Sequence, residues 1–318
     1  MNARPVADLA RNPEKLVDAL GLATELDRLR QILQGWVADC APAMRAMLEW
    51  QFFQRSKYFR PMTIFACHRA ASGEDVPDRL IRRAAVLEMM HNVSLIIDDI
   101  LDRSPMRRGV ATLHRQFGEL QALMASGYIV AEGYRLSAER PYDIALFSEL
   151  LERLGVAECV QWESRRQPAG YEDWKALAQE DTGSMFEICA ALATGDGSLR
   201  RFGRLLGTVY HGCDDVADVK GLESLGGGGE DDLRDGILTL PASLAIENDP
   251  EIRAMFCAPQ PSSADLERIS LAMREQIHSA EEKLDELAAE AKWEAQHHAP
   301  WPGSLYLLVD HTRELSRR

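Results

Sequence analysis

Two short acidic clusters of the same pattern are the residues best suited to chemistry in this chain. They read Asp98-Asp99-Ile100-Leu101-Asp102 and Asp214-Asp215-Val216-Ala217-Asp218. Residues i and i+4 share one face of a helix, so Asp98 should lie over Asp102 and Asp214 over Asp218. Each cluster ends an apolar stretch, where crowded carboxylates are unfavourable unless cations neutralise them. Two such pairs facing each other would surround Mg²⁺ that bridges a phosphorylated substrate.

The simpler interpretation of an acidic cluster at helical spacing is a solvated surface. That interpretation explains one cluster well. It explains the pair poorly, because each copy follows its own apolar run, at residues 93–97 and 205–210. The repetition therefore favours a shared metal-binding site.

Composition excludes several classes of partner. The chain has 318 residues and a formal net charge of −14, which argues against a nucleic-acid or anionic-membrane partner. No apolar run approaches the roughly 20 residues of a membrane span. Charged residues interrupt positions 1–20, so no signal-peptide pattern is present, and the six cysteines are scattered without a C-x-x-C pair. These features predict a cytoplasmic protein with free thiols, which would bind an anionic substrate through local cations.

The elements that must position the clusters are predicted to be helices. Apolar residues recur at spacings of three and four before the first cluster, at Leu80, Ala84, Leu87 and Met90. Helix-favouring residues dominate, and β-branched runs with turn pairs are lacking. No strong linker separates the clusters, so we predict one domain over residues 1–318. Residues 265–296 predict one charged outer helix, and the glycine run 226–229 predicts a mobile loop.

Five segments extend the signal beyond the clusters. They are S-K-Y-F-R-P at 56–61, residues 91–102 ending in the first cluster, R-R-G at 107–109, residues 213–218, and residues 232–241 ending in T-L-P. In order and spacing they resemble the trans-prenyltransferases (polyprenyl diphosphate synthases), over about residues 53–241. The resemblance implies an all-α isoprenoid-synthase fold, with antiparallel helices around a deep central cavity, usually in a homodimer.

The resemblance also implies a role for each matching residue. Asp98, Asp99 and Asp102 would hold two Mg²⁺ on an allylic diphosphate, and Asp214, Asp215 and Asp218 would hold a third. Arg107 would contact the allylic diphosphate, with Thr182 and His211 as further substrate contacts. Isopentenyl diphosphate would be bound by Lys57, Arg60, His91 and Arg108. The implied reaction is Mg²⁺-dependent condensation of these two substrates.

Some positions depart from the family pattern. The K-T pair appears as Asp181-Thr182, and the lysine of G-K-x-T-L-P is Ile237. The F-Q pair before the second cluster is Tyr210-His211, and a lysine usual in the following loop is replaced by the glycine run. Lost cations weaken the hold on a diphosphate. Lys220, Arg234 or His211 would have to replace them.

These departures keep two alternatives open. One is a class I terpene synthase or cyclase, which ionises a prenyl diphosphate without condensing it. The retained isopentenyl-site residues Lys57, Arg60 and Arg108 argue against a cyclase. The other is a non-catalytic partner subunit, against which both intact clusters argue.

Product length is predicted from the positions four and five before the first aspartate. In this family bulky residues there shorten the product, and here they are the small Ser94 and Val93. A lower cavity floor, together with the sequence around the first cluster, predicts a C20 product, geranylgeranyl diphosphate. A side chain of the next helix would then set the depth, with Leu123, Met124 and Tyr128 as candidates.

Overall fold

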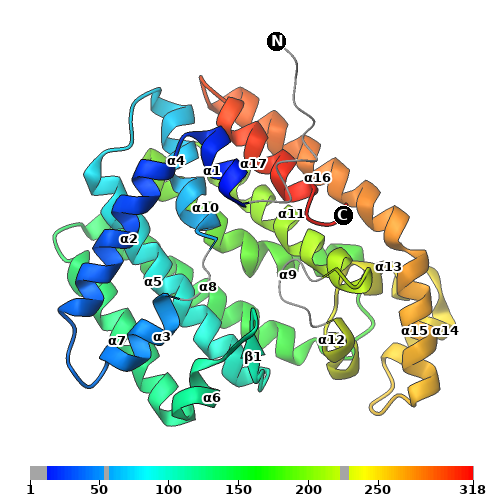
Figure 1. The fold of residues 1–318 in the computed structure, drawn as a ribbon. Coiled ribbons are helices and arrows are strands. Elements are labelled where there is room, and N and C mark those ends of the chain that lie inside the picture. The colour runs from blue at the N-terminus through cyan, green and yellow to red at the C-terminus, as the bar shows by residue number, and fades with distance from the viewer. Residues whose placement is uncertain (1–12, 54–56, 223–228, 318) are drawn as a thin grey trace.

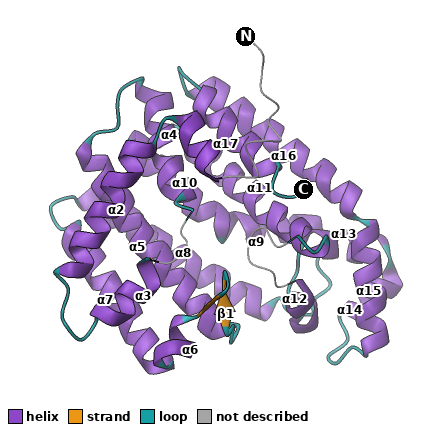
Figure 2. Ribbon diagram, in the orientation of Figure 1, coloured by secondary structure: helices purple, strands orange, loops and turns teal. Residues whose placement is uncertain are grey.

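The chain folds almost entirely into helices, as its sequence predicted (Figure 1, Figure 2). The structure is a computed structural model that describes residues 13–53, 57–222 and 229–317. Ser56 and most of the glycine run, residues 226–228, lie outside the described residues.

The described residues form helices and one two-stranded hairpin. In chain order they are α1 (Pro13–Leu20), α2 (Ala23–Ala38), α3 (Arg45–Phe52), α4 (Phe59–Ser72), α5 (Asp78–Leu101), β1 (Met106–Arg107), β2 (Val110–Ala111), α6 (Leu113–Phe117), α7 (Glu119–Leu136), α8 (Pro141–Glu163), α9 (Tyr171–Glu180), α10 (Thr182–Thr194), α11 (Arg200–Val219), α12 (Gly229–Asp235), α13 (Leu240–Asn248), α14 (Pro250–Phe256), α15 (Ser263–Glu275), α16 (Ile277–His298) and α17 (Gly303–Arg313).

Helix α10 forms the centre of the core. Every residue from Gly183 to Ala193 is buried, and α4, α5, α8, α9 and α11 all contact α10. In Figure 1, α8, α10 and α11 lie between α2 and α7 on one side and α13 to α15 on the other. One cluster of buried apolar side chains extends from Leu16 to Leu315. A single domain over residues 1–318 stays a prediction.

Glycines bring α10 and α11 unusually close together. A Cβ atom added at Gly203 would lie 2.3 Å from the carbonyl oxygen of Phe186, and one at Gly207 would lie 2.7 Å from that of Thr182. Distances this short exclude any side chain at either glycine without moving a backbone. As a result the first residue of α10 reaches α11, where Thr182 Oγ1 lies 3.0 Å from His211 Nδ1.

The two strands form a hairpin directly after α5. Arg107 pairs with Val110, and the turn residues Arg108 and Gly109 have φ angles of 53° and 80°. Two consecutive positive φ angles are the mark of a type I′ turn, which matches the twist of a hairpin. The turn folds Arg107 back toward α5.

The prediction of one outer helix over residues 265–296 is wrong. Helix α15 ends at Glu275 and α16 begins at Ile277, with the C-cap residue Gln276 between them. The break directs α16 along α11 and α17, with which it packs. Among the residues that the structure describes, no helix combines the length and the apolar character needed to cross a membrane.

Candidate functional site

The two aspartate clusters lie at the C-terminal ends of two helices. The first cluster occupies the last turn and C-cap of α5, and the second occupies the last two turns of α11. A helix carries partial negative charge at its C-terminal end, which adds to the charge of the carboxylates. Both helix ends therefore favour a bound cation.

Most of the predicted aspartates face one cavity of about 480 Å³, which we call the acidic cavity. Its lining includes Asp98, Asp102, Asp214, Asp215 and Asp218. Four further carboxylates line it from other elements: Glu158 and Glu163 of α8, Asp181 before α10 and Asp232 of α12. The structure thus brings both clusters together, as their spacing predicted, but Asp99 does not line this cavity.

Burial and crowding raise the pKa values of the carboxyl groups in the acidic cavity. Burial, followed by repulsion from Asp218 and Asp215, raises the pKa of Asp214 to about 7. Burial and Asp215 raise the pKa of Asp218 to about 6. Burial and neighbouring aspartates likewise raise the pKa values of Glu158 and Asp232 to about 7. These shifts mark carboxylates that lack compensating positive charge.

Two of the six predicted aspartates are held by other protein groups. Arg107 Nε donates to Asp99 Oδ1 at 2.7 Å. Asp215 Oδ2 accepts hydrogen bonds from Trp174 Nε1 and from the backbone N–H of Leu240, each at 2.8 Å. The middle aspartate of each cluster is therefore engaged by other protein groups. Judged on the described residues, the first and last aspartates are the better placed to bind a cation.

The acidic cavity suits Mg²⁺ that shares its coordination shell with a substrate. The Oδ1 atoms of Asp214 and Asp218 are buried and have no hydrogen-bond partner among the described residues. Within those residues, no three His, Cys, Asp or Glu side chains converge closely enough to hold a metal ion. Mg²⁺ commonly takes one or two carboxylates and completes its shell with water and phosphate oxygens. The residues therefore fit a metal that binds together with a diphosphate, rather than a closed protein cage.

The predicted cations gather in a second, smaller pocket of about 80 Å³, which we call the cationic pocket. Its lining includes Lys57, Arg60, His91 and Arg108, together with the first residues of α4. Arg60 Nη1 lies 2.9 Å from His91 Nε2. Burial, with Arg60 and Arg108, lowers the pKa of His91 well below its ordinary value, so the ring is neutral and accepts this bond. Arg60 Nε and His91 Nδ1 have no hydrogen-bond partner among the described residues, which suits an anion.

A third cavity of about 330 Å³, the central cavity, adjoins both. It shares Arg60, Arg108 and Tyr210 with the cationic pocket, and Asp98, Asp214 and His211 with the acidic cavity. Val93 and Ser94 of α5 line it, as predicted, and face apolar side chains from other helices. These are Leu151 and Leu154 of α8 and Met185 of α10.

The predicted role of α7 in closing the central cavity is wrong for this structure. Leu123, Met124 and Tyr128 do not line the cavity. Leu123 and Met124 are 43% and 55% exposed on the outer face of α7, and the Tyr128 hydroxyl accepts a hydrogen bond from the backbone N–H of Ala41. Helices α8 and α10 provide the wall instead, because they pack against each other beside α5.

Of the candidate replacements for the missing lysines, His211 lies in the site. Its Nδ1 atom is 3.3 Å from Asp181 Oδ2, and its Nε2 atom is 3.9 Å from Asp215 Oδ1. Burial opposes a charged ring, but Asp215 and Asp181 outweigh it and raise the pKa of His211 to about 9. His211 is therefore a cation at neutral pH and balances part of the acidic charge.

The other two candidates lie elsewhere. Lys220 Nζ donates to Glu281 Oε1 at 2.7 Å. Arg234 Nε lies 3.9 Å from Asp235 Oδ1. Neither residue lines any of the three cavities, so neither replaces a lysine in the acidic cavity.

Glu158 and Asp232 line the acidic cavity but were not predicted from the sequence as members of the site. Glu158 lies two helical turns after Leu151 on α8, so both fall on the face that lines the central cavity. That spacing could have indicated from the sequence that Glu158 shares a helix face with Leu151. Asp232 belongs to the last of the five resembling segments, but only the fold places it opposite the second cluster.

Comparison with known proteins agrees with this geometry. The family model described as polyprenyl synthetase matches residues 41–272. Solanesyl diphosphate synthase 2, chloroplastic, from Arabidopsis thaliana is 30% identical over 258 residues, which is 75% of this chain but only 62% of that protein. Nonaprenyl diphosphate synthase from Mycobacterium tuberculosis is 26% identical over 316 residues, covering 93% of this chain and 94% of that one.

The fold is also that of solved structures. A polyprenyl synthase from Caulobacter crescentus CB15, crystallised with calcium and isoprenyl diphosphate, superimposes with a TM-score of 0.83. The alignment covers 96% of this chain and 98% of that chain at 21% sequence identity. The predicted all-α isoprenoid-synthase fold is therefore confirmed.

Proposed function

Because the chain belongs to the polyprenyl synthetase family, we propose that it is a chain-elongating trans-prenyltransferase that condenses isopentenyl diphosphate with an allylic diphosphate. One observation carries this proposal: two unlike anion sites adjoin one cavity. The acidic cavity suits a diphosphate that arrives with Mg²⁺, and the cationic pocket suits one that arrives without metal. The central cavity shares wall residues with both.

The first and last aspartates of each cluster would hold Mg²⁺ with the allylic diphosphate. When bound, Mg²⁺ stabilises the negative charge that develops on a departing diphosphate. Arg107, which lines all three cavities, and the charged ring of His211 would add donors to the same group. Three ions per site, as the resemblance implies, remain a prediction.

The cationic pocket would orient the second substrate. Lys57, Arg60 and Arg108 bind the diphosphate of isopentenyl diphosphate, so its double bond points toward the central cavity. Apolar walls keep water from the allylic carbocation. The double bond attacks that carbon to form a carbon–carbon bond, and the departed diphosphate accepts the proton that the product releases.

The product proposed here is C20, geranylgeranyl diphosphate. Small side chains at Val93 and Ser94 support passage of a chain beyond C15. The names of the solanesyl and nonaprenyl relatives denote longer products, so chain length needs a direct measurement. Val93→Phe and Ser94→Phe should each shorten the product, and an unchanged product profile in both variants would refute this account of the floor.

A homodimer is the proposed assembly. Leu120, Leu123 and Met124 of α7 are 66%, 43% and 55% exposed, which leaves an apolar stripe on one helix. Stripes of this kind usually mark a contact surface. Light scattering coupled to size exclusion would give the mass, and a monomer at micromolar concentration would contradict the proposal.

One incubation tests the proposed reaction. The purified protein is mixed with Mg²⁺, labelled isopentenyl diphosphate and dimethylallyl, geranyl or farnesyl diphosphate, and products are weighed by mass spectrometry before and after phosphatase treatment. An elongated prenyl diphosphate is the expected result. Absence of turnover with all three donors would indicate a non-catalytic partner subunit.

A class I terpene synthase is the second candidate, and one observation favours it. Asp181 stands where the family has a lysine, so the acidic cavity has one cation fewer and one carboxylate more for an allylic diphosphate. A hydrocarbon or alcohol formed without consumption of isopentenyl diphosphate in the same incubation would identify this class.

A further inference from the structure

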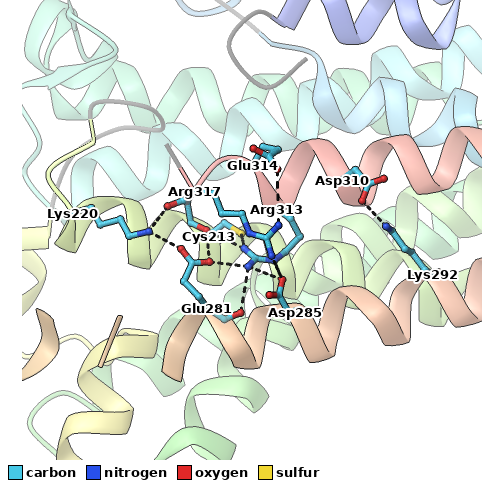
Figure 3. Close-up of polar contacts among 10 residues, drawn as sticks. Cys213, Lys220, Glu281, Asp285, Lys292, Asp310, Arg313, Glu314 and Arg317 are labelled. Atoms are coloured by element: carbon cyan, nitrogen blue, oxygen red, sulfur yellow. Dashed lines mark hydrogen bonds and ion pairs between the residues drawn. The ribbon is translucent and has the colours of Figure 1, made fainter. Parts of the chain in front are cut away.

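A buried ionic cluster lies behind the second aspartate motif, at the junction of α11, α16 and α17 (Figure 3). Its centre is Arg313 of α17, whose side chain is only 4% exposed. The nine labelled side chains come from the C-terminal part of α11 and its C-cap, from α16, and from α17 and the residues that follow it. None of them lines the acidic cavity.

Every donor of the Arg313 guanidinium is used. Nε donates to Asp285 Oδ1 at 2.9 Å, and Nη2 donates to Glu281 Oε2 at 2.8 Å and to the Glu281 carbonyl oxygen at 3.3 Å. Nη1 donates to Ser316 Oγ at 3.0 Å and contacts Cys213 Sγ at 3.4 Å. A rigid fork with five satisfied donors fixes the relative position of the elements it joins.

Two members of the cluster bracket the second motif on α11: Cys213, which Arg313 contacts, and Lys220, which shares Glu281 and Ser316 with Arg313. Cys213 is fully buried and directly precedes Asp214. At the other end, Lys220 caps α11 and donates to Glu281 Oε1 at 2.7 Å and to the Ser316 carbonyl oxygen at 2.6 Å. The segment that carries Asp214 and Asp218 is thus tied at both ends to a single cluster.

The bracketed segment needs such restraint. Asp214 and Asp218 have buried oxygens without hydrogen-bond partners in the described part of the chain, and they face further carboxylates across the acidic cavity. Mutual repulsion pushes these groups apart until a cation arrives. An anchor that resists this displacement keeps the coordinating oxygens in place before binding, and pre-organisation of this kind raises affinity without adding a contact.

We propose that Arg313 is a positioning residue for the second metal-binding motif: from the C-terminal helix it holds the end of α11 so that Asp214 and Asp218 stay aimed at the acidic cavity. This inference rests on the proposed function, because it assumes that those aspartates bind Mg²⁺ with a diphosphate. The ordinary alternative is that Arg313 only joins α16 to α17.

The chain offers a matched control for that alternative. Lys292 Nζ donates to Asp310 Oδ1 at 2.5 Å and joins the same two helices. In Figure 3 this pair lies apart from the Arg313 cluster, nearer the C-terminal end of α16 and before Arg313 on α17. Lys292→Met therefore removes a link between α16 and α17 without touching α11.

The test compares Arg313→Met, Arg313→Lys and Lys292→Met with the parent protein. Calorimetry measures binding of an unreactive thio-analogue of farnesyl diphosphate at several Mg²⁺ concentrations, and melting temperatures are recorded without metal. We expect Arg313→Met to raise the Mg²⁺ concentration needed for analogue binding by about tenfold, with partial recovery in Arg313→Lys. Lys292→Met should bind the analogue like the parent, whatever its melting temperature.

Equal Mg²⁺ requirements in Arg313→Met and the parent would overturn the proposal, and so would an equal loss in Lys292→Met. If Arg313→Met does not fold, Cys213→Ala removes only the contact to α11 and should shift the Mg²⁺ requirement in the same direction by a smaller factor. No shift in that variant would also overturn it. Turnover of the parent is scored separately, so a parent that binds the analogue with Mg²⁺ but elongates nothing refutes the proposed function and leaves the role of Arg313 standing.

Discussion

Glu187 and Asp214 each hold a carboxylate oxygen away from water, yet their surroundings are opposite. Glu187 of α10 accepts from Arg204 at 2.7 Å, Arg200 at 2.8 Å and Arg153 at 3.0 Å. Burial alone would raise its pKa, but these three arginines lower it below the ordinary value. Asp214 faces other carboxylates instead, and its pKa is raised to about 7. The Glu187 network joins helices through ion pairs within the protein. Among the described residues the Asp214 carboxylate has no such ion pair, and it is placed to bind a cation from outside the protein.

The difference shows how one acidic chain separates scaffold from site. Around Glu187 the protein supplies its own cations, so the network links α8, α10 and α11 without a ligand. In the acidic cavity the carboxylates outnumber the cations, and in the proposed function Mg²⁺ that arrives with a diphosphate completes the charge balance. Variants of the two regions should therefore fail in different ways.

The largest effect is expected from loss of a free aspartate. Asp98→Ala and Asp214→Ala should each lower turnover by at least about 100-fold, because transition-state charge on the diphosphate loses its metal. Both should also lose Mg²⁺-dependent binding of an unreactive allylic analogue, measured by calorimetry, without any fall in the melting temperature of the metal-free protein. If both variants retained metal-dependent binding, Asp98 and Asp214 would not be metal ligands, and they would no longer differ from Glu187 in role.

The reverse pattern is expected from Glu187→Gln. Removal of the shared carboxylate leaves three arginines facing one another, which should lower the free energy of unfolding by about 3 kcal/mol. Denaturant titration measures this loss. Calorimetry at a temperature where the variant is folded should give an unchanged Mg²⁺ requirement, and a changed one would mean that the scaffold and the site are not separate.

The two regions should also respond oppositely to pH. The pKa of Glu187 is lowered by folding, so its contribution to stability is present above its unfolded pKa of roughly 4.3 and is lost as the pH falls below that value. The pKa of Asp214 is raised to about 7, so ionisation destabilises the metal-free protein as the pH rises from about 4 to about 7.

Melting temperatures of Asp214→Asn and Glu187→Gln, recorded from about pH 3 to pH 8 in chelator, test this opposition. Relative to the parent, Asp214→Asn should gain a few degrees toward high pH, since roughly 1 kcal/mol moves a domain of this size by ~2–4 °C. Glu187→Gln should lose its disadvantage toward low pH. Parallel curves for the parent and either variant would contradict the assigned charge states.

The smallest effect is expected at His211, the cation inside the acidic cavity. His211→Gln keeps a hydrogen-bond donor but removes the charge, and it should raise KM for the allylic diphosphate about three- to tenfold. KM for isopentenyl diphosphate should stay constant, because His211 does not line the cationic pocket. Steady-state kinetics with each substrate varied in turn would separate the two, and equal changes in both constants would contradict this placement.

Local spacing was enough to predict the convergence of the two clusters. Asp98 with Asp102, and Asp214 with Asp218, follow the i, i+4 rule of a helix, and the apolar runs before them predicted buried helices. The cationic set was expected from the family resemblance, and the structure places Lys57, Arg60, His91 and Arg108 around one pocket.

What escaped prediction depends on contacts between distant residues. Nothing near Asp215 indicates that Trp174 and the Leu240 amide occupy it. Nothing near Lys220 indicates that it turns toward Glu281 instead of the cavity. The break at Gln276 also escaped, because both flanking segments keep the amphipathic pattern of one continuous helix.

The glycine crossing between α10 and α11 should make two remote positions as intolerant of substitution as the aspartates of the acidic cavity. Gly203 and Gly207 line none of the three cavities, yet even an alanine at either would force the backbones apart. In a saturation-mutagenesis survey, substitutions at both glycines should therefore lower activity as much as substitutions of the aspartates. A purely functional reading of such a map would then mistake a spacing requirement for a ligand contact.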